Sequence, residues 1–121
     1  MLESTFLIFL KHKGEKMGKY IELNSSNFDS ITKSGVSLVD FWAPWCGPCR
    51  MLNPIIEKLV DEFEGRANIC KVNADDEKDL VAKFGISSVP TILFIKDGEI
   101  VHQMIGASSE QSIRDRINSI L

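Results

Sequence analysis

Apolar and polar residues are arranged along the chain in a way that separates strand-like from helix-like segments. Residues 36–42 (VSLVDFW) are mostly apolar, which is typical of a strand buried on both faces. Residues 49–64 carry apolar side chains at helical spacing, and Gly65 follows as a stop signal. By the same criteria we expect strands at 20–23, 36–42, 67–74, 91–95 and 99–105, and helices at about 25–33, 49–64, 76–84 and from 108 to the C-terminus.

The order of these elements, β-α-β-α-β-α-β-β-α, predicts the fold. Strands that alternate with helices are expected to run parallel and to be joined by right-handed crossovers. The last two strands flank Lys96-Asp97-Gly98, which is typical of a hairpin turn and adds an antiparallel edge. We therefore expect an α/β fold with one central, mixed, five-stranded sheet that is flanked on both faces by about four helices.

Composition and charge narrow the class of protein. A chain of 121 residues that is 44% hydrophobic suits one domain with one packed core. The net charge is −3 and there is no long basic run, so nucleic acid is not an expected partner. Three cysteines are too few, and an odd number, for a disulfide framework. We therefore treat Cys46 and Cys49 as a pair with chemistry of its own and Cys70 as a spare.

Residues 1–18 differ in pattern from the rest, and we treat them as an extension to a domain at 19–121. Their apolar run, Phe6 to Leu10, has five residues, whereas a membrane span needs about 20. Positive charges follow this run instead of preceding it, which argues against a signal peptide. The extension is then a disordered tail or a translated leader. Its end can be back-translated as a purine-rich ribosome-binding sequence before an ATG, so that Met17 would be the natural start; an intact mass that includes residues 1–16 would exclude this.

The segment Cys46-Gly47-Pro48-Cys49 lies between the end of a buried strand and the start of a long helix. The first turn of a helix has unpaired N–H groups and a partial positive charge. Both stabilise a thiolate and lower the pKa of a cysteine below its free value of about 8.5. Gly47 leaves room for approach to the sulfur, and Pro48 suits a helical turn in which no N–H is needed. We expect Cys46 to be exposed and to attack, and Cys49 to face inward and complete the exchange.

Two other interpretations of the cysteine pair are weaker. A closed zinc site needs about four Cys or His ligands, and the chain offers only Cys70, His12 and His102 besides the pair. A permanently oxidised, structural disulfide is the second. An arrangement of strand, W-C-G-P-C and helix is a more specific sign of redox chemistry than the spacing alone.

Several segments of the chain resemble the thioredoxin family over residues 19–121, essentially without gaps. They are DFWAPWCGPCRMLNPIIEKLVDEFEG, KVNADD, FGISSVPTILFIKDGE and IGA at 105–107. The resemblance implies the thioredoxin fold and a protein-disulfide reductase activity that uses a redox-active Cys46–Cys49 disulfide and no bound cofactor. It also implies re-reduction by thioredoxin reductase with electrons from NADPH. Disulfide-containing proteins would be the targets, and the protein would be a cytoplasmic monomer that binds neither nucleic acid nor membrane.

Asp40 and Lys71 are polar residues inside apolar strands. A buried carboxylic acid is costly unless it stays neutral, and burial raises its pKa. Asp40 is therefore suited to take the proton of Cys49; an aspartate that merely ends a strand is the alternative. The resemblance supports proton transfer, since thioredoxins carry a buried Asp at this place. It also implies that Lys71 approaches this acid and tunes it, whereas a solvent-facing strand lysine is the alternative.

A further set of residues is expected to bind the target protein. The resemblance implies a cis peptide bond before Pro90, packed against the cysteine pair, and a trans turn proline is the alternative. The backbone of Val89 would then offer hydrogen bonds to an extended target segment. An apolar patch around the cysteines would let many flexible targets dock, and it comprises Trp45, Pro48, Val89, Ile105, Gly106 and Ala107.

Three other conspicuous residues receive structural interpretations from the sequence. Trp42 is expected to pack behind the site as part of the core. Cys70 is expected to be a small buried hydrophobic side chain. His102 is expected at the surface of the edge strand.

Two alternative functions fit the same fold. One is a disulfide oxidant or isomerase, which often has His before the second cysteine; Pro48 at that position favours a reductant. The other is a binding subunit that uses the apolar patch and not the sulfurs.

Overall fold

The computed structural model of the chain describes residues 19–121. Its elements, in chain order, are β1 (Ile21–Glu22), α2 (Phe28–Thr32), β2 (Val36–Trp42), α3 (Gly47–Glu62), β3 (Ala67–Asn73), α4 (Lys78–Phe84), β4 (Thr91–Lys96), β5 (Glu99–Ile105) and α5 (Glu110–Ile120). Each strand and helix expected from the sequence is present, with ends that differ by a few residues. The predicted extension at 1–18, its proposed start at Met17 and His12 lie outside the described residues.

Capping residues set where the two long helices begin. Cys46 is the N-cap of α3, with an extended backbone at φ −87° and ψ 111°. The helix therefore starts at Gly47, two residues earlier than expected. Ser109 caps α5, and its hydroxyl accepts the backbone N–H of Ser112 at 3.1 Å. Such a cap satisfies one of the free N–H groups of the first turn.

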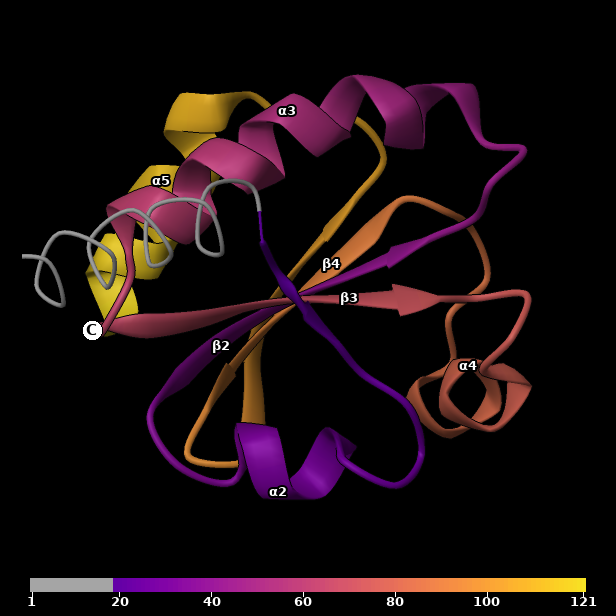
Figure 1. Ribbon diagram of the computed structural model, residues 1–121, viewed down its shortest axis with the longest axis horizontal. Helices are drawn as coiled ribbons and strands as arrows, with labels where there is room; N and C mark the ends of the chain where they lie inside the picture. Colours follow the sequence, from indigo (N-terminus) through magenta and orange to yellow (C-terminus); the bar gives the residue numbers. More distant parts are fainter. Residues whose placement is uncertain (1–18) are drawn as a thin grey trace, which may run out of the picture.

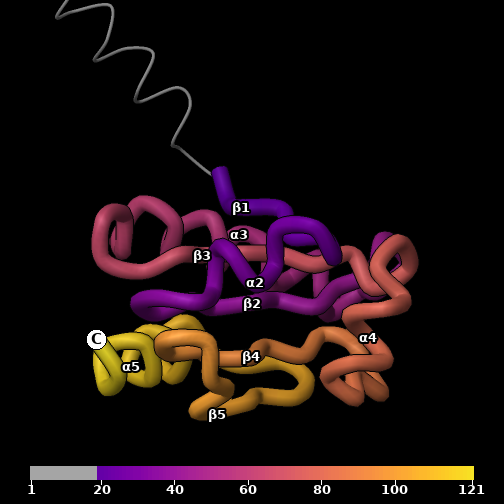
Figure 2. Tube along the Cα trace, turned by 90° about the horizontal axis from the view of Figure 1, so that it is seen from below, coloured from indigo at the N-terminus to yellow at the C-terminus, as the bar shows by residue number. Residues whose placement is uncertain are grey.

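The five strands form one sheet in the order β1-β3-β2-β4-β5. Figure 2 shows the strands one below another in this order. β3 pairs in parallel with β1 and with β2. β4 pairs antiparallel with β2, and β5 pairs antiparallel with β4. The predicted mixed, five-stranded sheet is confirmed, and β2 is its central strand.

The direction of β4 corrects the expectation that only the last strand would be antiparallel. α4, which connects β3 to β4, has seven residues and is about 10 Å long. β3 also has seven residues but spans about 23 Å. α4 is therefore too short to lead the chain back across the sheet. The chain re-enters at the end where β3 left it, and Thr91 at the start of β4 pairs with Phe41 near the end of β2.

Side chains of β2 alternate between two cores, one on each face of the sheet. Val36 and Leu38 pack with residues of α3 and α5, whereas Val39 and Phe41 pack with residues of α2 and α4. Figure 1 shows these two pairs of helices on opposite sides of the sheet. Because side chains of a strand alternate with a period of two, Asp40 faces the same side as Leu38, toward α3.

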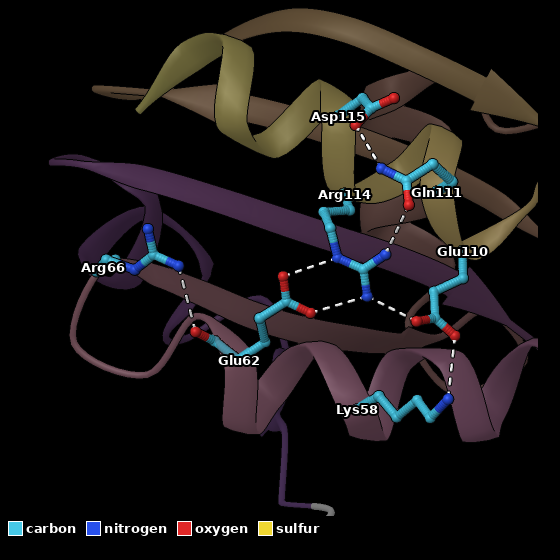
Figure 3. Close-up of polar contacts among 7 residues, drawn as sticks. All are labelled: Lys58, Glu62, Arg66, Glu110, Gln111, Arg114 and Asp115. Carbon is cyan, nitrogen blue, oxygen red and sulfur yellow. Dashed lines mark hydrogen bonds and ion pairs between the residues drawn. The ribbon is translucent and has the colours of Figure 1, made fainter.

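An ion-pair network joins α5 to α3 (Figure 3). Arg114 of α5 donates to both carboxylate oxygens of Glu62 of α3, from Nε at 2.7 Å and from Nη2 at 2.8 Å. The same Nη2 donates to Glu110 at 2.6 Å, and Lys58 Nζ donates to the other oxygen of Glu110 at 3.3 Å. The hydrogen bonds from Arg114 lower the pKa of Glu62 and the pKa of Glu110. The network ties the C-terminal helix to the helix that begins at the cysteine pair.

We expect Arg114→Met to lower the midpoint of thermal unfolding by a few degrees, because both glutamates lose the cation that they share. The loss should shrink in about 1 M NaCl, since salt screens partly exposed ion pairs. Lys58→Met removes a single contact to Glu110 and is the matched control, which should lower the midpoint less. Thermal unfolding followed by circular dichroism checks this. A midpoint unchanged by Arg114→Met at low salt would show that the network does not hold α5 in place.

Candidate active site

The cysteine pair lies where β2 leaves the sheet and α3 begins (Figure 1). The sulfurs of Cys46 and Cys49 are joined in a disulfide bond. Sγ of Cys46 also accepts the backbone N–H of Cys49 at 3.1 Å. One free N–H group of the first helical turn is thus directed at this sulfur, which is the geometry that stabilises negative charge there.

Both cysteines are buried, whereas the sequence predicted burial for Cys49 alone. Cys49 is fully buried, as expected. Cys46 is only 3% exposed, so the expectation of an exposed Cys46 is wrong for this disulfide form. Its side chain packs in a small cluster with Ala43, Cys49 and Val89, and its sulfur lies 3.7 Å from the carbonyl oxygen of Val89. The neighbouring Trp45 is 68% exposed and marks the open side of the pair.

Asp40 is a fully buried carboxyl group in the interior of β2. Neither of its oxygens has a hydrogen-bond partner among the described residues. Burial raises its pKa from 3.8 to about 7, and the positive charge of Lys71 opposes this rise. The strand continues for two residues beyond Asp40, so the alternative that Asp40 merely ends a strand is wrong. A carboxyl group with this pKa can gain or lose a proton near neutral pH.

Lys71 is buried beside Asp40 and does not face solvent. The two residues are directly opposite each other in the parallel pairing of β2 and β3. Lys71 Nζ donates to Asn53 Oδ1 at 2.6 Å, and it lies 4.5 Å from the centre of the Trp42 ring and 4.8 Å from the centre of the Tyr20 ring. Trp42, predicted as plain core, is half-buried and covers this cation.

The predicted target-binding residues of the later chain are brought to the same place. The Val89–Pro90 peptide bond is cis. The N–H of Gly106 donates to the carbonyl oxygen of Pro90 at 2.9 Å, which fixes the end of β5 beside this bond. Gly106 has φ +85°, a left-handed conformation that side chains disfavour. Val89 packs on the cysteine cluster, and Ile105 is 60% exposed.

Sequence reasoning missed some residues of this region. Asn53, which binds Lys71, follows Cys49 by four residues, so helical spacing alone places both on one face of α3. Asp75 accepts a hydrogen bond from Trp45 Nε1 at 3.1 Å. Met51 is the most exposed large hydrophobic side chain of the described residues, at 79%. The departure of Met51 from the buried stripe of α3 could have indicated this.

The remaining candidates do not contribute chemistry to the site. Cys70 is buried, and burial raises the pKa of its thiol to about 12. His102 is half-buried, and its ring centre lies 5.7 Å from that of Phe94. Among residues 19–121 no three His, Cys, Asp or Glu side chains are grouped to hold a metal ion. Within the same range, none of the helices has the length and apolar character that a membrane span requires.

Comparison with known proteins identifies relatives of the whole described chain. The family model for thioredoxin matches residues 19–119. Thioredoxin from Chlorobaculum thiosulfatiphilum is 46% identical over 103 residues, which cover 84% of this chain and 95% of that protein. Thioredoxin from Staphylococcus saprophyticus is 42% identical over 101 residues, with coverage of 84% and 97%. Among solved structures, a mutant thioredoxin from Halobacterium salinarum superimposes with a TM-score of 0.79 at 32% identity, with coverage of 87% of this chain and 93% of that one.

Proposed function

The chain belongs to the thioredoxin family, whose members are thiol–disulfide oxidoreductases, and from this premise we propose how its own residues reduce disulfide bonds in other proteins. The protein is a protein-disulfide reductase, and its redox-active group is the Cys46–Cys49 disulfide. The observation that carries this function is the position of the pair at the N-terminus of α3.

In the first step, the reduced protein attacks its target. The thiolate of Cys46 attacks one sulfur of the target disulfide, a mixed disulfide forms, and the other target sulfur leaves as a thiolate. The N–H of Cys49, which is 3.1 Å from Cys46 Sγ, supports this role because it stabilises the negative charge. Gly47 and Pro48 tune the sulfur by holding the first turn of the helix in place.

In the second step, Cys49 releases the reduced target. Asp40 accepts the proton of the Cys49 thiol, and the resulting thiolate attacks Cys46 Sγ. The bond between Cys46 and the target breaks, the target sulfur leaves as a thiolate, and the Cys46–Cys49 disulfide remains. Two electrons have then passed from the pair to the target. The pKa of about 7 suits Asp40 to this task near neutral pH, and the charge of the buried Lys71 adjusts it.

Target proteins would dock on the apolar patch around the disulfide. Trp45 and Ile105 offer exposed apolar side chains for this docking, and Pro48 and Ala107 are exposed as well. The backbone of Val89, next to cis Pro90, would hydrogen-bond an extended target segment as an added strand. Gly106 has no side chain to block this approach. Such a surface accepts many sequences because it reads backbone and general apolar character.

The oxidised protein would be re-reduced by thioredoxin reductase with electrons from NADPH. Since NADPH delivers a hydride, that is, two electrons, one equivalent converts one disulfide to one dithiol. We place this cycle in the cytoplasm, with a monomer as the working form and disulfide-containing proteins as the targets. The relatives that carry the name thioredoxin support the disulfide-containing targets and the reductase partner.

A coupled assay tests the function. With NADPH and a bacterial thioredoxin reductase, the protein should reduce insulin disulfides at a rate proportional to its concentration, followed by NADPH absorbance and by insulin precipitation. Its reduction potential should lie below about −200 mV, since reductants of this fold are more reducing than isomerases and oxidants. A clearly higher potential would favour the alternative of an oxidant or isomerase. A binding subunit would show no NADPH consumption at all.

A further inference from the structure

We propose that Asn53 is a positioning residue of the active site: its side-chain oxygen holds the Lys71 ammonium against α3 and keeps it out of contact with the Asp40 carboxylate. The functional meaning of this inference rests on the proposed proton transfer by Asp40. Its structural content does not depend on that role, because the charge of Lys71 acts on Asp40 at a given distance whether or not that group takes part in turnover.

The geometry leaves Lys71 a choice between two acceptors. Lys71 and Asp40 are directly opposite on neighbouring parallel strands, which lie about 4.8 Å apart. Both side chains point toward α3, and the flexible four-carbon stem of lysine allows its ammonium to turn to either side. Yet both oxygens of Asp40 are without a hydrogen-bond partner among the described residues, while Lys71 Nζ lies 2.6 Å from Asn53 Oδ1. The Lys71 ammonium is therefore hydrogen-bonded to Asn53 and not to Asp40.

Aromatic rings complete the environment that holds the ammonium away from the acid. The ring of Trp42, at the end of β2, and the ring of Tyr20, just before β1, lie 4.5 Å and 4.8 Å from Lys71 Nζ. Ring faces attract a cation without giving it a hydrogen-bond acceptor. Asn53 thus supplies the hydrogen bond among these contacts, and it adds no charge.

Acidic groups on three elements attract the same ammonium. They are Asp40 on β2, Glu57 on α3 and Glu22 on β1, and all three oppose the fall in the pKa of Lys71 that burial causes. Glu57 is exposed and Glu22 belongs to the short edge strand, so water weakens their pull. Asp40 is the buried competitor. Without Asn53, we expect the ammonium to turn to Asp40, because a buried, unpartnered carboxylate gains most from a direct ion pair.

The experiment is an NMR titration of the Asp40 side-chain carboxyl carbon in the oxidised full-length protein. In Asn53→Leu, the measured pKa of Asp40 should fall by about 1 pH unit or more, because Lys71 pairs with the carboxylate. In Asn53→Asp, the pKa should rise, because a new carboxylate at this position neutralises Lys71. Opposite shifts from two substitutions at one site are not expected from a general loss of packing. Unchanged titrations, or shifts in the same direction, would overturn the proposal.

Two controls separate positioning from structural effects. In a Lys71→Met background, Asn53→Leu should leave the Asp40 titration unchanged; a shift of the same size as before would show that Asn53 does not act through Lys71. Asp61→Leu, an exposed position of the same helix, should not move the Asp40 pKa in the otherwise unaltered protein. If only Asn53→Asp folds, its upward shift should be smaller in the Lys71→Met background, where only the direct repulsion between the two carboxylates remains; an equal shift in both backgrounds would overturn the proposal.

The titration also distinguishes this inference from the proposed mechanism. The pH profile of target reduction should move with the Asp40 pKa in both Asn53 variants. If the titration shifts as expected and the profile does not, Asn53 positions Lys71 but Asp40 is not the proton acceptor. If the titration does not shift, the positioning role fails, and the mechanism remains to be judged on Asp40 itself.

Discussion

Replacement of Cys49 by serine is expected to stop turnover while leaving the first half of the reaction intact. Cys46 retains its place at the N-terminus of α3, so its thiolate still attacks a target disulfide. The serine hydroxyl cannot displace the target, and the mixed disulfide accumulates. With an excess of a disulfide-containing protein, we expect one target molecule bound per protein, visible as a band of higher mass on non-reducing gels and released by dithiothreitol.

Two further cysteine variants make this result specific. Cys46→Ser should give neither turnover nor a trapped target, because Cys46 Sγ is the sulfur that accepts the N–H of Cys49 and is stabilised there as the attacking thiolate. Cys70→Ser is the matched control, and it should react as the parent does, since burial keeps the Cys70 thiol neutral and out of reach. If Cys46→Ser and Cys49→Ser both retained full activity, the protein would act through its surface and not its sulfurs.

Asp40→Asn should slow target reduction at pH 7 at least about tenfold, since proton transfer by a positioned side chain contributes factors of about 10² or more. The parent should lose activity as pH falls below about 7, where Asp40 holds its proton and cannot accept another. The variant should lack this inflection. Initial rates of insulin reduction across the range from mildly acidic to mildly basic pH measure both effects, and a variant with parental rates at pH 7 would remove Asp40 from the mechanism.

The same substitution should change how stability depends on pH. Asp40 has a pKa of about 7 in the folded chain and 3.8 as an ordinary carboxyl group, so between these values the folded state holds a proton that the unfolded state lacks. Its contribution to the free energy of unfolding is therefore greatest below about pH 4, declines up to about pH 7, and is constant above. The total decline is about 4 kcal/mol.

An asparagine does not titrate, so the free energy of unfolding of the variant does not decline with pH through this group. The stability of Asp40→Asn relative to the parent should rise by about 4 kcal/mol between pH 4 and pH 8, as measured by urea unfolding of the oxidised proteins. The absolute offset includes the cost of burying an amide, but the trend with pH does not. A difference that stays flat over this range would mean that Asp40 is ionised in the folded state at all these pH values.

Periodicity was sufficient to predict every strand and helix of the described chain, because most of them bury one apolar face or two; the edge strand β5, which has no buried residue, is an exception. It was also sufficient to single out Asp40, since a carboxyl group inside an apolar strand is costly to bury and is seldom there for a purely structural reason. The direction of β4 depends on a comparison of lengths, α4 against β3, that the order of strands and helices does not contain, although the predicted bounds of the two elements would have allowed it. The burial of Cys46 depended on Val89, 43 residues away, which only the folded chain brings next to it.

The position of Lys71, at the surface or in the interior, could not be predicted from the sequence pattern alone. A lysine between two apolar residues of a strand is equally consistent with the surface and with the interior, and only resemblance to a family favoured the interior. Helical spacing places its partner Asn53 on the same face as Cys49, but nothing in the sequence links Asn53 to Lys71. The contact between them is set by the distance of α3 from the sheet, which results from the packing of Leu52 and Ile56 beneath it.

The antiparallel course of β4 also determines where a label or solid support can be attached to the protein. The strand starts beside the cysteines and ends, six residues or about 20 Å later, at the exposed Lys96 on the far rim of the sheet. A dye, biotin or solid support coupled to this amine would stay clear of the docking surface. Immobilised by that handle, the protein would present its disulfide to the surrounding solution, as a column that captures target proteins requires.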